Sequence, residues 1–252
     1  MASAKPLISI ITVTYNAQST LPPTLASVKE QMWTDYEHLI IDGASKDSTI
    51  QIAKEASTEK TRIISERDKG IYDAMNKGIR HANGKYLIFL NAGDTFHSKN
   101  TLKTIASTII ENSYPGIVYG QTQLVDSNRI RIGDRHLTAP EKLTVDSFAK
   151  GMLVCHQAFI ASVDIISEYN LAYRFSADYD WCIRCLQKSK NNILIPEILI
   201  DYLNEGVTTA NHRASLKERF HIMCHYYGSV LTTLNHIKFI PRFILNKIRQ
   251  NH

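Results

Sequence analysis

The sequence predicts an α/β fold built on an open, mostly parallel sheet with helices on both faces, followed by a helical C-terminal tail. Three observations carry this prediction. Strand-like and helix-like segments alternate through the first half of the chain. The strand segments are nearly continuous apolar runs, as expected for strands that are buried on both faces. The 252 residues, of which 44 % are hydrophobic, suffice for one large domain with its own core.

The first half of the chain supplies the elements of the parallel sheet in order. Residues 7–14 form an apolar strand, and a helix over 19–32 begins at Ser19 or Thr20, with Pro22 in its first turn. Further strands are expected at 36–42, 62–65, 86–90 and 116–120, separated by helices at 47–57, 71–83 and 99–112. This β-α-β order predicts parallel pairing of neighbouring strands.

The second half is less regular. We expect a hairpin over 121–133, a short strand or turn over 153–161, a helix that opens at 177–181, and a strand over 193–202 that Pro196 interrupts. The four cysteines are Cys155, Cys182, Cys185 and Cys224. They form only one C-x-x-C pair, inside a predicted helix, which favours packing thiols over a zinc or redox site. With no signal peptide and no apolar run of membrane-spanning length, we interpret the body as cytoplasmic.

Net charge is distributed unevenly along the chain, which carries +5 overall. Residues 211–252 hold seven basic residues and one acid, Glu218, for a charge of +6, whereas residues 1–210 carry −1. A near-neutral body argues against nucleic-acid binding over the whole surface. The tail also places apolar side chains at helical spacing between basic ones, as in helices that lie on anionic membranes. The alternative is a helix that packs on the body or on a second copy of the chain.

Polar side chains follow four successive predicted strands. Residues 14–16, 42–49 and 66–68 come after the first three, and Asn91 and Asp94 after the fourth. Because ligands bind beyond the carboxyl ends of such strands, we expect these side chains to line one crevice. The crevice is acidic and has no glycine-rich phosphate loop with a lysine. A diphosphate would therefore need a bridging divalent metal, Mg²⁺ or Mn²⁺.

Three segments together resemble the nucleotide-binding half of GT-A glycosyltransferases of family 2. They are Thr14-Tyr15-Asn16, Asp42-Gly-Ala-Ser-Lys-Asp-Ser-Thr49, and Ser65-Glu-Arg-Asp-Lys-Gly-Ile-Tyr-Asp-Ala-Met-Asn-Lys-Gly-Ile79. The resemblance extends over about residues 5–210. It implies a GT-A domain over 1–210, with a nucleotide-binding half at about 5–120 and an acceptor half at about 121–210, and leaves 211–252 as a basic amphipathic tail.

The resemblance implies roles for the residues of the nucleotide-binding half. Thr14, Tyr15 and Asn16 would line the nucleoside pocket, and Asp42 would accept a hydrogen bond from a pyrimidine ring N–H. Asp68 would complete the pocket for base and ribose. Asn76 and Gly78 would lie on the helix that borders the donor sugar and the phosphates. This set, with Asn91, is what we expect to bind the nucleotide, with uracil or thymine as the base.

The segment Phe89-Leu-Asn-Ala-Gly-Asp94 lies where the family has its Asp-x-Asp metal motif. Asp94 would bind the metal, but Asn91 replaces the first Asp, so the site has one carboxylate fewer than the family pattern. His212 is a further candidate ligand for Mn²⁺, with an ordinary exposed histidine as the alternative.

Two aspartates compete for the role of catalytic base. Asp178 matches the family's base, which deprotonates the acceptor hydroxyl, and Asp180 is its rival in Ala-Asp-Tyr-Asp-Trp. The positive end of a helix suits a carboxylate, so Asp178 as a helix cap is the alternative. His156 and Gln157 match the acceptor side of the family, with a packed polar pair as the alternative.

The resemblance implies a metal-assisted inverting glycosyltransferase. It would move a sugar from a nucleotide diphosphate sugar, with UDP-sugars favoured, to a saccharide or lipid-linked glycan in bacterial cell-surface polysaccharide synthesis. The expected location is the cytoplasm, with peripheral contact to the plasma membrane through the tail. A nucleotidyltransferase, or a non-catalytic nucleotide or sugar-binding module, remains as an alternative, and the oligomeric state stays open.

Overall fold

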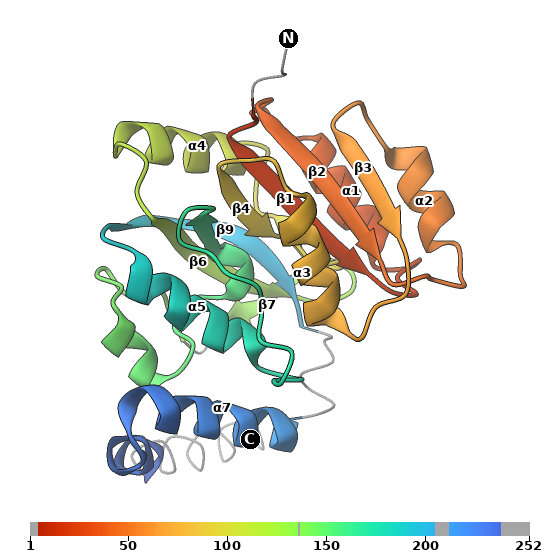
Figure 1. The fold of residues 1–252 in the computed structure, drawn as a ribbon. Coiled ribbons are helices and arrows are strands. Elements are labelled where there is room, and N and C mark those ends of the chain that lie inside the picture. Colours follow the sequence, from red (N-terminus) through yellow and green to blue (C-terminus); the bar gives the residue numbers. More distant parts are fainter. Residues whose placement is uncertain (1–4, 136, 205–211, 238–252) are drawn as a thin grey trace.

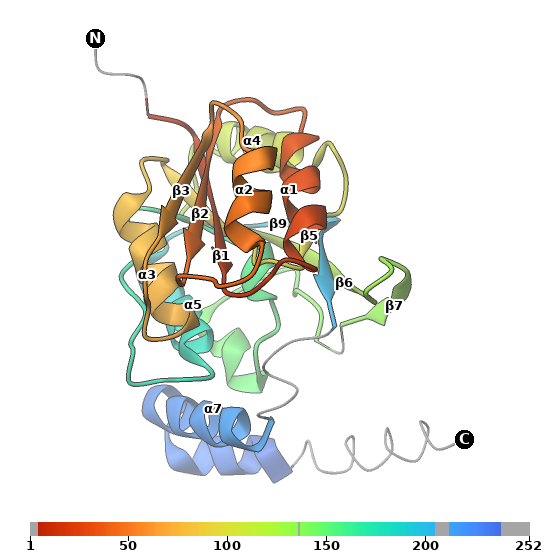
Figure 2. The ribbon, with the colours of Figure 1, turned by 90° about the vertical axis from the view of Figure 1, so that its right-hand side faces the viewer.

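The computed structural model describes residues 5–135, 137–204 and 212–237, and its centre is one large sheet (Figure 1). The strand order across the sheet is β3-β2-β1-β4-β8-β6-β9-β5, and β7 pairs with β6 outside this path. Helices cover both faces, as the sequence predicts, with α1 and α2 on one face and α3 on the other (Figure 2). None of the helices formed by the described residues is long and apolar enough to cross a membrane.

The parallel half of the sheet follows the predicted alternation of strands and helices closely. Strand β1 pairs in parallel with both β2 and β4, and β2 pairs in parallel with β3. The elements are β1 (Ile8–Thr14), α1 (Leu21–Lys29), β2 (Tyr36–Asp42), α2 (Thr49–Ala56), β3 (Thr61–Ser65), α3 (Ile71–His81), β4 (Tyr86–Phe89) and α4 (Thr101–Glu111). Each lies within about three residues of its predicted bounds because buried apolar strands and amphipathic helices leave clear patterns.

Alternation along β1 divides the core between the two faces of the sheet. Ile8 and Ile10 pack with residues of α1 and α4, whereas Ile11 packs with residues of α3 and α5 (Ala177–Lys188). A Cβ at Gly78 of α3 would lie 2.5 Å from Cγ2 of Ile11, so the helix needs glycine there to approach the strand. This close packing fixes α3, whose first turn borders the functional site.

The second half of the sheet is mixed. Its strands are β6 (Ile117–Val125), β7 (Arg131–Asp134), β8 (Phe159–Ser162), β9 (Asn192–Leu203) and the unpredicted two-residue β5 (Thr95–Phe96). Strand β8 is antiparallel to β4 and β6, β9 runs parallel to β6, and β6 and β7 form the predicted hairpin. Pro196 does not end β9, because a register shift opposite Gly120 and Gln121 accommodates it as a bulge.

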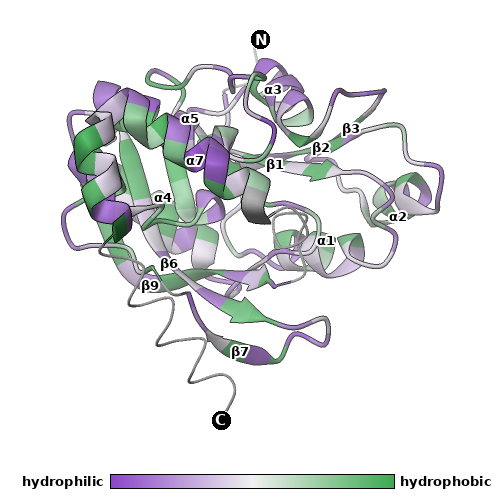
Figure 3. Cartoon of the chain, turned by 90° about the horizontal axis from the view of Figure 1, so that it is seen from below, coloured by the Kyte–Doolittle hydropathy of each residue, from purple (hydrophilic) through white to green (hydrophobic). Residues whose placement is uncertain are grey.

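The described part of the C-terminal tail packs on the body. Helix α7 (His212–Tyr227) buries Ile222 and Met223 against the core, and residues 229–237 are helical as well. The predicted alternative, a helix packed on the body, is therefore what the structure gives for α7. Hydrophobic and hydrophilic residues alternate along this part of the chain (Figure 3). Residues 238–252, the other part of the predicted tail, lie outside the described residues.

Candidate active site

A cleft of about 890 Å³ lies at the carboxyl ends of β1 and β4, and β1 points downward in Figure 2. Its volume is in the range of ligand-binding sites. Its walls come from four segments that are far apart in the sequence: residues 13–17 with Thr20, residues 68–74, Asn91 with Ala92, and residues 171–175 without Ala172. Three of these follow the ends of predicted strands, whereas residues 42–49 and Asp94, which the sequence predicts in the same crevice, do not line the cleft.

Residues at the end of β1 form one wall of the cleft. Hydrogen bonds connect this wall to the loop after β2. Asn16 has a left-handed backbone (φ +48°), its N–H donates to Ser45 Oγ at 2.8 Å, and its Oδ1 accepts from the Lys46 N–H at 2.9 Å. Tyr15 is 62 % exposed, so its ring is available to stack on a ligand. Thr14 is buried and donates to Asp42 at 3.1 Å.

The Asp42 carboxylate is fully buried directly behind this wall. It accepts hydrogen bonds from the hydroxyls of Thr14, Ser45 and Ser65 and from the Ser45 N–H. Burial raises the pKa of Asp42, but these hydrogen bonds outweigh it and lower the pKa below its usual value, so the group stays ionised. All four acceptor positions are occupied, and a contact with a pyrimidine N–H would replace one of these bonds.

Asp68 lies in the cleft wall, where its Oδ1 accepts from the Gly70 N–H at 2.9 Å. Its other oxygen packs over Gly43, where a Cβ would collide with it. Asn76 and Gly78 are outside the cleft wall. Asn76 is buried and exchanges two hydrogen bonds with the backbone of Tyr169, at 3.0 and 2.6 Å. These two residues of the family-like segment therefore hold α3 in place, and the helix borders the cleft through residues 71–74.

The turn from Asn91 to Asp94 follows β4 and is closed by a bond from the Asp94 N–H to the Asn91 carbonyl. Asn91 lies in the cleft wall, and its Oδ1 is buried with no partner among the described residues. Asp94 is 4 % exposed. Its Oδ1 accepts from the Leu203 N–H at 3.0 Å and its Oδ2 from the Gln157 side chain at 2.7 Å. Burial raises the pKa of Asp94 to about 7.

The described residues do not fit a divalent cation held by the protein. They contain no group of three or more His, Cys, Asp or Glu side chains placed to hold one. Each oxygen of Asp94 already accepts one hydrogen bond, and Asn91 Oδ1 is a buried side-chain oxygen of the turn with no partner among the described residues. Cations such as Mg²⁺ prefer carboxylates with open coordination positions. The side chain of His212, the other predicted ligand, lies outside the described residues.

His156 and Gln157 lie in a short 3-10 helix (His156–Ala158) and are both buried. The ring of His156 is 2.6 Å from the Tyr169 hydroxyl and packs against Phe89 and Trp181. Burial lowers the pKa of His156 to about 4, so the ring is neutral at pH 7. Gln157 holds Asp94. In this structure the two residues are the packed polar pair that the sequence offered as an alternative to an acceptor site.

Asp178 and Asp180 have different surroundings at the start of α5. Asp178 is half-buried, and its Oδ1 accepts from the Tyr72 hydroxyl at 3.0 Å and from the Tyr179 N–H at 2.9 Å. Tyr72 belongs to the cleft wall, so Asp178 is in direct contact with a residue that lines the cleft. Within the part of the chain that the structure describes, no hydrogen bond to its Oδ2 is found.

Asp180 is 4 % exposed, and both of its oxygens are engaged. Arg184 Nε donates to Oδ2 at 2.8 Å, and the Tyr226 hydroxyl of α7 donates to Oδ1 at 2.8 Å. The burial and the ion pair indicate a structural role for Asp180, which connects α5 to α7 through Tyr226. Between the two candidates, only Asp178 contacts a residue of the cleft wall and has an oxygen that accepts no hydrogen bond from the described residues.

Helix α7 also supports the cleft wall. Glu218 accepts hydrogen bonds from the backbone N–H groups of Arg174 and Phe175, at 2.8 and 2.7 Å. Tyr72 stands in the family-like segment, so the sequence carried a signal for it, whereas nothing local in the sequence marks Glu218. The role of Glu218 depends on hydrogen bonds to Arg174 and Phe175, which lie more than 40 residues away along the chain.

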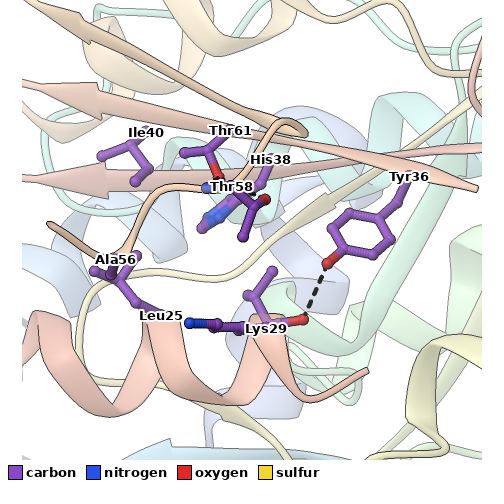
Figure 4. Close-up of a pocket in the computed structure, with 9 residues that line it drawn as sticks. Leu25, Lys29, Tyr36, His38, Ile40, Ala56, Thr58 and Thr61 are labelled. Carbon is purple, nitrogen blue, oxygen red and sulfur yellow. Dashed lines mark hydrogen bonds between the residues drawn. The ribbon is translucent and has the colours of Figure 1, made fainter. Parts of the chain in front are cut away.

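A second and much smaller cavity, of about 10 Å³, lies between α1 and β2 (Figure 4). Tyr36 and His38 line it, and the Tyr36 hydroxyl donates to the Val28 carbonyl at 3.2 Å. The cavity has room for about one water molecule. It is a packing defect of the core and is too small for a substrate.

Comparisons with known proteins agree with this geometry. Residues 9–170 match the family described as Glycosyl transferase family 2. A PGL/p-HBAD biosynthesis glycosyltransferase of Mycobacterium bovis is 32 % identical over 219 residues, which cover 84 % of this chain and 80 % of the relative. The UDP-Glc:alpha-D-GlcNAc-diphosphoundecaprenol beta-1,3-glucosyltransferase WfgD of Escherichia coli is 26 % identical over 174 residues, which cover 69 % of this chain and 67 % of the relative.

Two solved structures show the same fold. The crystal structure of S. aureus TarS 1-349 has a TM-score of 0.70 at 15 % identity, and the similarity covers 92 % of this chain and 72 % of TarS. The mannosyltransferase PcManGT from Pyrobaculum calidifontis, solved with GDP-Man and Mn²⁺, has a TM-score of 0.63 at 14 % identity, with coverage of 95 % and 76 %. These matches confirm the predicted GT-A-like fold. The chain belongs to glycosyl transferase family 2 and is a nucleotide-sugar glycosyltransferase.

Proposed function

We propose that the chain is an inverting hexosyltransferase that moves a sugar from a UDP-sugar to a hydroxyl group of a saccharide or lipid-linked glycan acceptor. The observation that carries the proposal is the hydrogen bond from Tyr72, a residue of the cleft wall, to Oδ1 of Asp178, whose Oδ2 accepts no hydrogen bond from the described residues. The similarity to WfgD, a UDP-Glc-dependent glucosyltransferase that acts on GlcNAc-diphosphoundecaprenol, supports this donor and acceptor class. So does a TarS structure solved with UDP-GlcNAc.

The proposed reaction needs one base and one displacement. Asp178 takes the proton of the acceptor hydroxyl, the oxygen attacks the anomeric carbon, and the bond from that carbon to the nucleotide diphosphate breaks. Attack from the face opposite the leaving group inverts the anomeric configuration. A positioned base of this kind contributes typically about 10²–10⁴-fold to the rate. The Tyr72 hydroxyl holds the carboxylate in one orientation, which saves the cost of ordering it in the transition state.

The donor nucleotide is assigned to the wall formed by residues 14–16 and 68–74. The exposed ring of Tyr15 offers a face for the base, and Asp68 offers a carboxylate oxygen to the ribose. Asn91 lies in the same wall, with an unpartnered amide oxygen that can accept from a ribose hydroxyl. Asp42 keeps the loop after β2 in place through its four hydrogen bonds.

A requirement for Mn²⁺ or Mg²⁺ stays a prediction for this chain. PcManGT was solved with Mn²⁺, but Asp94 of this chain has no unengaged oxygen to offer a cation. A metal would neutralise charge on the leaving diphosphate when bound. No step above depends on it.

The membrane contact predicted from the tail also stays a proposal. In the described part, residues 230, 231, 234 and 237 expose apolar side chains, with Val230 75 % exposed, and basic residues follow in the sequence. This combination suits the surface of an anionic bilayer at the cytoplasmic face, where lipid-linked acceptors of surface polysaccharides would be met. The contact between Asp178 and Tyr72 of the cleft wall supports an active enzyme rather than a binding module, and the family match gives no support for a nucleotidyltransferase.

The experiment that tests the proposal is a transfer assay with a panel of UDP-sugars, GDP-mannose and a diphosphoundecaprenol-linked GlcNAc acceptor. We expect acceptor-dependent release of UDP from one of the UDP-sugars. Binding of nucleotide without transfer to any saccharide acceptor would contradict the enzymatic role, and exclusive use of GDP-mannose would contradict the donor assignment.

A further inference from the structure

Arg129 lies at the tip of the β6–β7 hairpin and reaches the turn where the family carries its metal motif. Its backbone is left-handed (φ +66°), an unusual conformation for arginine, and is held by a bond from its N–H to the Asp126 carbonyl at 3.0 Å. Its Nη1 donates to the carbonyl of Gly93. Gly93 directly follows Ala92, which lines the cleft, so the guanidinium group contacts a residue adjacent to the cleft wall.

Among the described residues, the remaining donors of Arg129 have no hydrogen-bond partner. Nε is buried and without a hydrogen bond, and among the described residues no acceptor is found for Nη2 and no ion pair for the side chain. Asp94 and Asp201 are close enough to act on its charge, although neither forms an ion pair with it. Nε and Nη2 form the edge of the guanidinium group that binds carboxylates and phosphates in bidentate fashion.

The turn therefore offers a cation where the family pattern has a carboxylate-bound metal. Asn91 contributes no charge, Asp94 has both oxygens engaged by hydrogen bonds, and Arg129 adds a positive charge. A nucleotide diphosphate needs positive charge at its phosphates, and an unpartnered donor that is removed from water costs about 1–3 kcal/mol until it finds an acceptor. The same ligand can also satisfy the orphaned Oδ1 of Asn91 through a ribose hydroxyl.

We infer that Arg129 binds the diphosphate of the donor at the Asn91–Asp94 turn, in the place that a divalent cation holds in the family pattern. The inference rests on the proposed function, since it concerns the donor of that same cleft. The side chain is partly exposed on a hairpin tip, so it can turn its Nε–Nη2 edge toward a phosphate while its backbone stays fixed. The leaving nucleotide diphosphate is then stabilised by a fixed cation of the protein.

The test measures calorimetric affinities for UDP, GDP and uridine, in EDTA and in Mn²⁺, for the wild type, Arg129→Met and Arg129→Lys. Arg131→Met is the matched control, because Arg131 lies on the same hairpin, is exposed and pairs with Asp134 away from the turn. In EDTA we expect Arg129→Met to weaken binding of the diphosphate by roughly 10- to 100-fold, the range of a charge-assisted hydrogen bond. Uridine affinity should stay within about twofold, with Arg129→Lys in between and Arg131→Met unchanged.

Three results would overturn the inference. The first is an unchanged UDP affinity of Arg129→Met in EDTA. The second is a loss of uridine affinity in Arg129→Met as large as its loss of UDP affinity, which would mean that the turn has lost its shape. The third is a wild-type UDP affinity that falls more than 100-fold when Mn²⁺ is removed. A wild type that binds neither UDP nor GDP would instead contradict the proposed function itself. The two failures are thus separated, because each of the first three results requires a wild type that binds the nucleotide in Mn²⁺, whereas the last is a wild type that binds no nucleotide under either condition.

Discussion

We expect Asp178→Asn and Asp180→Asn to have different effects. The first should lower catalytic turnover, and the second should lower the stability of the fold. Asp178→Asn keeps the size of the side chain and one oxygen for the Tyr72 hydroxyl, so the fold should change little. It removes the base, and we expect kcat to fall by about 10²–10⁴-fold, which corresponds to about 3–5 kcal/mol in the activation barrier. Affinity for the nucleotide should stay within about threefold of the wild type.

Asp180→Asn acts on a buried ion pair. Breaking such a pair costs about 3–5 kcal/mol when the remaining charge is left uncompensated. Arg184 keeps its bonds to Ser167 and to the Glu168 carbonyl, and its side chain is 24 % exposed, so we expect a cost at or just below the lower end of this range, about 2–3 kcal/mol. For a chain of this size that loss lowers Tm by about 5–10 °C.

The assay pairs thermal unfolding with UDP release at saturating donor and acceptor, for both variants at a temperature where both are folded. The reasoning predicts a large loss of kcat without a loss of Tm for Asp178→Asn, and a loss of Tm with most of kcat retained for Asp180→Asn. A folded Asp180→Asn that loses kcat by 10²-fold or more, while Asp178→Asn keeps full turnover, would refute the assignment of the base.

Further changes test the surroundings of the site. Tyr72→Phe removes the hydroxyl that orients Asp178 and should lower kcat about 3- to 30-fold with little change in the donor KM; a KM effect alone would contradict the positioning role. Burial lowers the pKa of His38 to about 4, so the neutral ring contributes its full stability above pH 6.5, and this contribution falls as the pH drops toward 4. At pH 5 the wild type should have lost about 2 kcal/mol of unfolding free energy from this group. Denaturant unfolding of His38→Asn should show a smaller loss of unfolding free energy between pH 7 and pH 5. Gly78→Ala forces a methyl group against Ile11 and should destabilise the fold by about 1–3 kcal/mol, whereas no change in unfolding free energy would show that α3 can move away. A chain ending at residue 235 should lose sedimentation with anionic vesicles, and equal sedimentation with the full chain would remove the membrane proposal.

The sequence predicted the parallel half of the fold well because its signals are local. Strands β1, β2 and β4 are apolar runs buried on both faces, and their neighbours are helices with clear starts. The crevice followed from topology alone, since polar residues after parallel strands must share one edge. Strand β5 was not predicted, because two residues carry no periodicity and pair only with the distant Asp201 and Ile200.

The identity of the site residues could be predicted only where the contact is local or the family-like segment marks it. Thr14, Tyr15, Asn16 and Asp68 do lie at the cleft. The sequence could not separate Asp178 from Asp180, because the difference depends on Tyr72 and Tyr226, which are 106 and 46 residues away. Arg129 has no local signal either, since a hairpin register brings it to Gly93.

The account as a whole depends on direct displacement from a UDP-sugar in the cleft, with Asp178 as the base. The measurement that tests this most directly is the anomeric configuration of the product, determined by NMR after transfer from an α-linked UDP-hexose to the lipid-linked acceptor. The account predicts a β-linked product, one UDP released for each linkage formed, and product formation by Asp178→Asn that is slower by about 10²–10⁴-fold. An α-linked product, or a β-linked one formed equally fast by Asp178→Asn, would contradict it.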